Sequence, residues 1–149
     1  MNKTNDSIDA SGWFKLQVYE NGKLVSSFEE KNLVVTLGQQ NVARLLGGHA
    51  SGKKIEKIAI GTNATSPALG DTAITGAFTK AITGATYPET NSVMFNFDID
   101  NAEANGMVIR EFGLLNSDNV LCARKVRTGE ITKTSAIRLV GTWKLTINS

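Results

Sequence analysis

The chain has 149 residues, 41% hydrophobic and 20% charged, a balance typical of one globular domain with its own core. Sixteen basic and fourteen acidic residues give a net charge of +2, which argues against nucleic-acid binding through bulk charge, and no apolar run is long enough to span a membrane. The single cysteine, Cys122, and the single histidine, His49, exclude an internal disulfide and a zinc site built from these residue types.

The N-terminal residues are predicted to lie outside the folded core. Residues 1–11 are mostly polar and include one isoleucine, so we expect a flexible N-terminal arm. They lack the apolar segment of a signal peptide. Residues 12–149 are expected to form a single β-rich domain, because neither a second domain nor an internal repeat is visible in the sequence.

The first predicted element is a β-hairpin. From Ser11 the sequence alternates between apolar and polar residues, which places three apolar side chains on one face: Phe14, Leu16 and Val18. Asn21-Gly22 then predicts a type I′ turn, since both central positions of that turn need positive φ. The returning strand is expected over residues 23–30, with Leu24 and Phe28 pointing inward.

A change of period predicts the one helix of the chain, from Leu37 to Leu46. Thr36 is the expected N-cap, and Gly47-Gly48 supplies the positive φ that ends the helix. Four apolar side chains are expected to form the buried helix face: Leu37, Val42, Leu45 and Leu46.

Short strands are predicted through the rest of the chain. Residues 55–61 form one, with Ile58 and Ile60 on one face, and a Gly-, Thr- and Pro-rich loop follows. Residues 73–87 alternate only weakly, whereas residues 92–100 alternate most regularly. Three further strands are expected near residues 107–116, 120–127 and 135–148. Seven or eight short strands with turn-rich joints predict a mostly-β sandwich or barrel-like fold with one short helix.

Residues 47–54 (GGHASGKK) match part of a phosphate-binding P-loop. The position that should carry the Mg²⁺-binding Ser or Thr is Lys54, and the predicted order is helix, loop, strand rather than strand, loop, helix. A helix C-cap followed by a turn is therefore the favoured interpretation.

Two groups of acids are weighed as sites. Four residues resemble the start of a calcium loop: Asp98, Asp100, Asn101 and Glu103. Ala102 and Glu103 occupy the positions where such a loop needs an oxygen ligand and a glycine, so a solvated turn is expected instead. Glu111 stands in an apolar strand beside Arg110. No second acid is placed to cooperate with it, and we interpret it as an ion-pair or hydrogen-bonding group.

The basic residues near the C-terminus are the one local charge excess: Arg124, Lys125, Arg127, Lys133 and Arg138. Few aromatic residues lie near them in sequence, so the stacking platform of a single-strand binder is missing. A charged β face that resists edge-to-edge pairing, or a contact between subunits, is the favoured interpretation.

The order of four stretches resembles that of small structural proteins of tailed bacteriophages, of tail-fibre, baseplate or particle-decorating type. The stretches are residues 32–38 (NLVVTLG) with 45–48 (LLGG), residues 58–62 (IAIGT) with 67–72 (PALGDT), residues 109–115 (IREFGLL), and residues 122–124 (CAR). Within them, Asp71 is expected to cap nearby N–H groups, and Gly113 to let a backbone or a ring such as Trp143 approach closely.

The resemblance implies a non-enzymatic virion component, with no catalytic, cofactor-binding or metal-binding residues. Its expected partners are copies of itself, as a homo-oligomer, and neighbouring virion proteins; nucleic acid and membrane are not expected partners. A tail, baseplate or fibre part comes first, and a capsid decoration protein is the alternative. A carbohydrate or host-surface binding module is the rival from another class, and it would use exposed aromatic side chains such as Trp13, Tyr19 and Tyr87.

Overall fold

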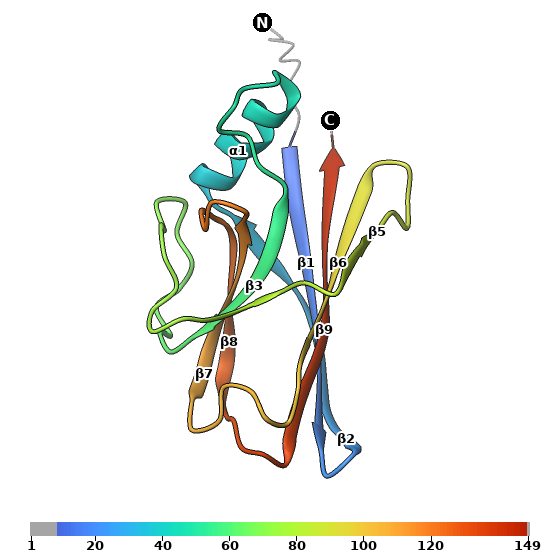
Figure 1. Cartoon of the computed structure of the whole chain (residues 1–149), viewed down its shortest axis with the longest axis vertical. Helices are drawn as coiled ribbons and strands as arrows, with labels where there is room; N and C mark the ends of the chain where they lie inside the picture. Colours follow the sequence, from blue (N-terminus) through green and yellow to red (C-terminus); the bar gives the residue numbers. More distant parts are fainter. Residues whose placement is uncertain (1–8, 149) are drawn as a thin grey trace, which may run out of the picture.

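The computed structural model describes residues 9–148 and confirms the predicted mostly-β domain with one short helix (Figure 1). Within these residues the elements are β1 (Asp9–Glu20), β2 (Lys23–Val34), α1 (Thr36–Leu46), β3 (Ile55–Gly61), β4 (Phe78–Ala81), β5 (Gly84–Thr86), β6 (Ser92–Ile99), β7 (Val108–Asn116), β8 (Leu121–Thr132) and β9 (Ile137–Asn148). The prediction of a flexible arm is wrong for residues 9–11, which begin β1 and pair with the end of β9. Residues 1–8 lie outside the described part.

All strand pairs are antiparallel, and they form one curled sheet in the order β4-β3-β7-β8-β2-β1-β9-β6-β5. The two outermost strands, β4 and β5, follow each other directly in the chain. Ile82 N donates to the carbonyl of Glu56 in β3, and Thr83 N donates to the carbonyl of Asn96 in β6. The weakly patterned residues 78–86 therefore bridge the two edges of the curled sheet (Figure 1).

The sheet is joined least firmly between β2 and β8. These strands pair only at Leu33 and Val34, so residues 23–32 have a strand neighbour on the β1 side alone. β2 is exposed along most of its length, and it runs four residues beyond its predicted end at residue 30. β2 thus has one free backbone edge over residues 23–32, whereas β1, on its other side, is paired along its whole length with β9.

The hairpin turn is as predicted, with φ of 50° at Asn21 and 80° at Gly22. The prediction that Leu24 points inward is wrong: its side chain is 51% exposed. The pairing register places Leu24 opposite Tyr19, and a bulge beside Tyr19 shifts the alternation of β2 against β1. A bulge changes which face each residue occupies, and the apolar pattern alone does not reveal it.

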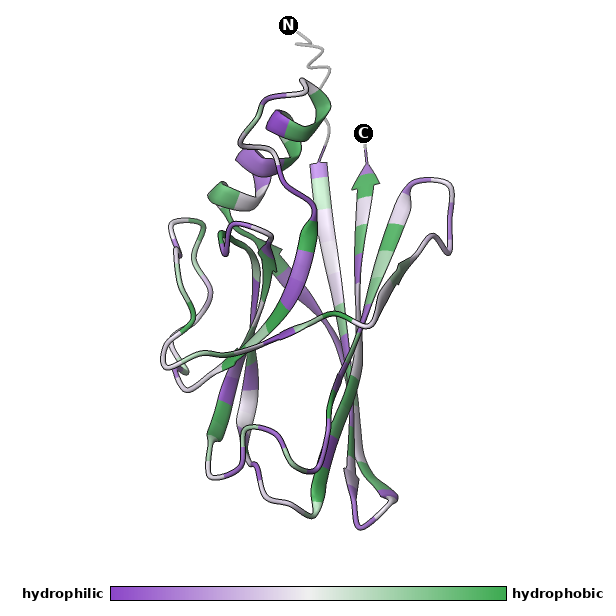
Figure 2. Ribbon diagram, in the orientation of Figure 1, coloured by the Kyte–Doolittle hydropathy of each residue, from purple (hydrophilic) through white to green (hydrophobic). Residues whose placement is uncertain are grey.

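Aromatic rings fill the centre of the core. The ring of Phe14 lies 4.7 Å from that of Phe112 and 4.9 Å from that of Trp143, in tilted and edge-on arrangements, and 5.9 Å from that of Phe97. All four side chains are essentially inaccessible to water. Figure 2 shows the alternation along the strands that produces this core, with hydrophobic and hydrophilic residues in turn. Facing surfaces of the curled sheet thereby meet in one apolar interior.

Two predictions about the helix, its N-cap and its buried face, differ from the structure. It begins at Thr36, and the N-cap residue is Val35 with no side-chain cap, so Thr36 does not cap the helix. Its buried residues are Gly38 and Asn41. Of the four side chains predicted on the buried face, Leu37 and Val42 are half-buried, whereas Leu45 and Leu46 are exposed. A Cβ added to Gly38 would lie 2.0 Å from the carbonyl oxygen of Cys122, so glycine is what allows α1 to approach β8 this closely.

Candidate functional site

A buried ion cluster joins β7 and β8. The side chains of Glu111 and Arg124 are 0% and 2% exposed, and Arg124 Nε donates to Glu111 Oε1 over 3.0 Å. Arg124 Nη1 lies 2.9 Å from Asp71 Oδ2, and its Nη2 donates to the carbonyl of Asn63. Glu111 Oε2 accepts the backbone N–H groups of Asn63 and Thr75, at 2.7 and 3.1 Å. Both carboxylate oxygens of Glu111 therefore have partners, as a buried charge requires.

This cluster fastens the loop of residues 62–77 to the sheet. Thr62 N donates to the carbonyl of Thr75 and closes the loop at its base. Asp71 Oδ2 also accepts the N–H of Ala68, which confirms Asp71 as a local cap. The interpretation of Glu111 as an ion-pair residue is likewise confirmed. Since its oxygens are engaged by a guanidinium and two N–H groups, Glu111 holds a loop in place and has no lone carboxylate face turned to a substrate.

Glycines make room for the same loop. A Cβ on Gly61 would lie 2.4 Å from Ile74 and 2.6 Å from the carbonyl oxygen of Thr75. A Cβ on Gly113 would lie 2.7 Å from Ile74 and 2.8 Å from Leu121. The close approach expected at Gly113 is therefore made by the side chains of Ile74 and Leu121, not by the ring of Trp143.

The four stretches that carry the phage resemblance meet at this place. The ion cluster draws one residue or more from the second, third and fourth stretches, as described above. The first stretch joins through the backbone: Val35 N donates to Cys122 O over 3.1 Å, and Thr36 N donates to Leu69 O over 2.9 Å. Residues far apart in sequence thus form one contiguous unit at the junction of α1, β3, β7 and β8.

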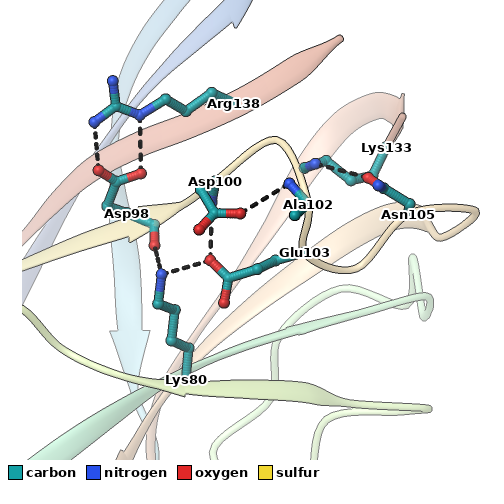
Figure 3. A network of polar contacts seen from close by, with 8 residues as sticks. All are labelled: Lys80, Asp98, Asp100, Ala102, Glu103, Asn105, Lys133 and Arg138. Carbon is teal, nitrogen blue, oxygen red and sulfur yellow. Dashed lines mark hydrogen bonds and ion pairs between the residues drawn. The ribbon is translucent and has the colours of Figure 1, made fainter. Parts of the chain in front are cut away.

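A second polar network holds the turn after β6 (Figure 3). Asp98 binds Arg138 through both carboxylate oxygens, and Lys80 Nζ binds Glu103 and the carbonyl of Asp98. Asp100 Oδ1 accepts the N–H of Ala102 in the same turn. The hydrogen bond from Arg138 holds the pKa of Asp98 below its ordinary value. The acids that resemble a calcium loop are thus engaged with basic groups and turn N–H groups.

Lys133 stands beside this network and is buried. Its Nζ donates to Asn105 Oδ1 over 3.0 Å and to the carbonyl of Thr134 (Figure 3). Burial lowers the pKa of its ammonium group, an effect partly opposed by Asp100 and Glu103. Among residues 9–148, no group of three or more His, Cys, Asp and Glu side chains is placed to hold a metal ion.

The P-loop-like residues 47–54 form a turn between α1 and β3, the order expected of a C-cap rather than a nucleotide site. Gly48 has φ of 69°, and His49 Nδ1 accepts the N–H of Ser51. The side-chain amide of Asn41 exchanges two hydrogen bonds with the backbone of Lys53, at 2.7 and 2.9 Å. These contacts fix the turn without aiming a row of N–H groups at one point.

The predicted basic cluster is dispersed. Arg124 and Lys133 are buried, and Lys125 pairs with Glu30. Arg127 lies over the ring of Phe28, 5.2 Å from its centroid. Arg138 is the only one of the five that pairs on an exposed face within residues 9–148, where its partner is Asp98. These residues therefore make internal contacts and present no shared basic patch.

The three aromatic residues weighed for carbohydrate binding line separate depressions. Trp13 lines one of about 320 Å³ on the outer sheet face, beside Gln17, Thr142 and Lys144. Its Nε1 donates to Glu29. Tyr19 belongs to a depression near Arg138, and Tyr87 to a groove beside α1. No two of them share a stacking platform among these depressions.

The groove beside α1 has the most apolar lining of the depressions described here. It measures about 330 Å³ and lies between α1, the first residues of β1, the last residues of β9 and the β5–β6 hairpin. Its lining is mostly apolar and includes Val42, Leu45, Tyr87, Phe95 and Ile147, with Lys54 as the one charged residue. Cys122 also lines it, and burial raises the pKa of that thiol to about 11.

Large apolar side chains are exposed around this groove. Leu46 is 76% exposed, Tyr87 77% and Leu45 47%. Figure 2 shows hydrophobic residues on α1 and at the tip of β9, on the same end of the domain. The sequence pattern did not reveal the groove, because it predicted Leu45 and Leu46 on the buried helix face. The usable signal was Gly38, in the first turn of the helix, where a small residue permits close packing.

Comparisons with protein-family models, with curated proteins and with solved structures return no match for this chain. Within residues 9–148, no helix is both long and apolar enough to cross a membrane. The function is therefore argued from the chain's own surfaces.

Proposed function

We propose that the protein is a non-enzymatic structural component of a tailed-bacteriophage particle, of tail, baseplate or fibre type, that assembles through symmetric contacts. The observation that carries the proposal is the apolar groove beside α1, with the exposed Leu45 and Tyr87 in its lining and the exposed Leu46 in the adjoining depression. Grouped apolar side chains of this size favour burial against another surface, at roughly 25 cal/mol for each Å² removed from water.

The polar interior also supports a structural role. A catalytic acid or base needs a polar atom that is free to meet a substrate. Here Glu111 and Arg124 are saturated by each other and by loop backbone groups. Such a cluster keeps an irregular loop in one shape, which suits a subunit whose exposed surfaces must match a neighbour.

The order of the four sequence stretches also supports the proposed role in a phage particle. The four stretches that resemble tailed-phage structural proteins are the ones that build a single unit around Asp71, Glu111 and Arg124. The resemblance to tailed-phage structural proteins therefore concerns the residues that hold this unit together. A capsid decoration protein remains the alternative within the same class.

The experiment is to look for the protein in particles. Tailed particles released by the cell that encodes the chain are purified on a density gradient, and their proteins are quantified by mass spectrometry. We expect this chain at a fixed ratio to the major particle proteins, with antibody-gold labelling at the tail. Labelling over the capsid would select the decoration alternative. Expression of the chain without incorporation into particles would contradict both.

Glycan binding at the Trp13 depression is a second candidate. The observation in its favour is an indole beside Gln17, Thr142 and Lys144, which combines a stacking face with hydrogen-bonding groups. Titration with a panel of bacterial surface oligosaccharides should then change the Trp13 resonance or its fluorescence. Binding of the same oligosaccharide, measured by calorimetry, should be abolished by Trp13→Ala and partly retained by Trp13→Phe. A panel that leaves the wild-type signal unchanged would remove this candidate.

A further inference from the structure

We propose that the protein associates head to tail, with the tip of the β1–β2 hairpin of one copy seated in the apolar groove beside α1 of the next. The inference rests on the assembly function proposed above and names the partner of the groove as a second copy of this chain. Two different surfaces, an exposed apolar hairpin tip and an apolar groove, make the contact.

The first surface is the hairpin tip. Leu24 and Val25 are 51% and 55% exposed, and they stand beside the tight turn. The tip is held in position, because Asn21 N donates to the carbonyl of Ala136 over 2.9 Å. An exposed apolar pair on a braced hairpin is a preformed contact that needs little ordering on binding.

The hollow surface lies at the opposite end of the domain. Figure 1 shows the β1–β2 turn at one end and α1, with the open ends of β1, β9 and β6, at the other. The groove of about 330 Å³ exceeds the roughly 150 Å³ that suffices to hold a benzene molecule. It therefore has room for the two aliphatic side chains of the tip.

Charges at the two ends are complementary. Glu20 and Lys23 flank the turn, while Lys54 lines the groove and Asp9 lines the depression next to it. Within residues 9–148, none of these four side chains forms an ion pair. Each end therefore carries one acid and one base. When the tip sits in the groove, Glu20 can pair with Lys54 and Lys23 can pair with Asp9.

The contact is heterologous, so it repeats. Because the tip and the groove are different surfaces, each copy keeps a free tip and a free groove, and the chain of contacts ends only if it closes into a ring. Two aliphatic side chains bury far less than the roughly 800 Å² per partner of a stable interface. Each contact is accordingly weak in dilute solution and gains strength in an array where many form at once.

Disulfide trapping tests the pairing. In a Cys122→Ala background, Val25→Cys protein is mixed with Leu45→Cys protein under mild oxidation. We expect a cross-linked heterodimer several-fold above either homodimer. A protein carrying both substitutions should give a ladder of oligomers. The matched control is Val25→Cys with Thr65→Cys, since residue 65 is exposed on the loop of residues 62–77 and does not line the groove.

Charge reversal adds a test that does not depend on the thiols. Lys54→Glu in the groove partner should lower the heterodimer yield several-fold, and Glu20→Lys in the tip partner should restore it. Leu45→Cys homodimers in excess would indicate a two-fold contact and overturn the proposal, as would a yield no higher than the Thr65 control. If trapping fails while the wild-type protein still exceeds its monomer mass of 16.0 kDa, the head-to-tail contact is wrong and assembly uses another surface.

Discussion

Two ion networks of similar chemistry hold two loops of this protein, and they differ mainly in their access to water. Glu111 and Arg124 are shielded almost completely, whereas Arg138 and Asp98 keep 50% and 28% of their side-chain surface exposed. Water and salt weaken the second pair and cannot reach the first. Burial, more than the number of ion pairs, therefore decides how firmly each loop is fixed.

The buried network also accepts hydrogen bonds from backbone N–H groups of an irregular loop. Glu111 takes the N–H groups of Asn63 and Thr75, one from each end of a loop that has no regular structure over residues 62–77. In the exposed network, the turn after β6 is supported mostly by its own bonds, such as Ala102 N to Asp100 Oδ1. Losing the first network should release a loop; losing the second should leave its turn closed.

The largest effect is expected from Glu111→Gln. The substitution keeps the shape and removes the one fully buried counter-charge of Arg124, which leaves Asp71 as its remaining partner. Removing one partner of a buried pair costs about 3–5 kcal/mol, and Asp71 should hold the loss near the lower end of that range. Urea unfolding measures the free-energy change. The matched control is Glu130→Gln, whose pair with Arg110 is exposed, and it should cost less than about 1 kcal/mol. Equal losses in the two variants would show that burial is not the deciding factor.

A smaller loss is expected from Gly61→Ala. The new Cβ would lie 2.6 Å from the Thr75 carbonyl oxygen and 2.8 Å from Glu111 Oε2, so the loop must move off the ion cluster, at a cost of about 1–3 kcal/mol. Hydrogen exchange at the amides of Asn63 and Thr75 should accelerate with it. Gly70→Ala, in the same loop with open space around it, is the control and should change neither quantity. Slow exchange at both amides in Gly61→Ala protein would argue against this tether.

The smallest effect is expected from Asp98→Asn, because its pair with Arg138 is open to solvent. Arg138 lowers the pKa of folded Asp98 below 3.8, so the pair stabilises the fold above that pH and stops doing so as pH falls through the lowered pKa. Wild type and variant should differ slightly in melting temperature at neutral pH and low salt. The difference should vanish in high salt and in strong acid. A difference that persists in high salt would mean that this network is shielded after all.

Sequence patterns predicted features whose cause is local. Asn21-Gly22 specifies its turn through two backbone angles, and the lone acid Glu111 in an apolar strand needs a counter-charge wherever that comes from. The partners themselves could not be predicted: Arg124 meets Asp71 across 53 positions of sequence, and only the pairing of β3, β7 and β8 brings them together.

The predictions of burial at the groove and at the hairpin tip were wrong for a related reason. Periodicity marked Leu24, Leu45 and Leu46 as apolar and therefore as buried, but exposure depends on which neighbour arrives. At α1 the close contact is made by Gly38, which turns the leucines away from the sheet. At the tip a bulge reverses the facing of Leu24. Both wrong predictions concern side chains that we assign to assembly contacts. These side chains are apolar and remain exposed in the single chain.

Light scattering of the pure protein over a wide concentration range tests assembly most directly. The account predicts a mass that rises above the 16.0 kDa of one chain as concentration increases, and a return to that monomer mass on Val25→Asp with an unchanged circular dichroism spectrum. A wild-type mass of 16.0 kDa at every concentration would contradict self-association of this chain.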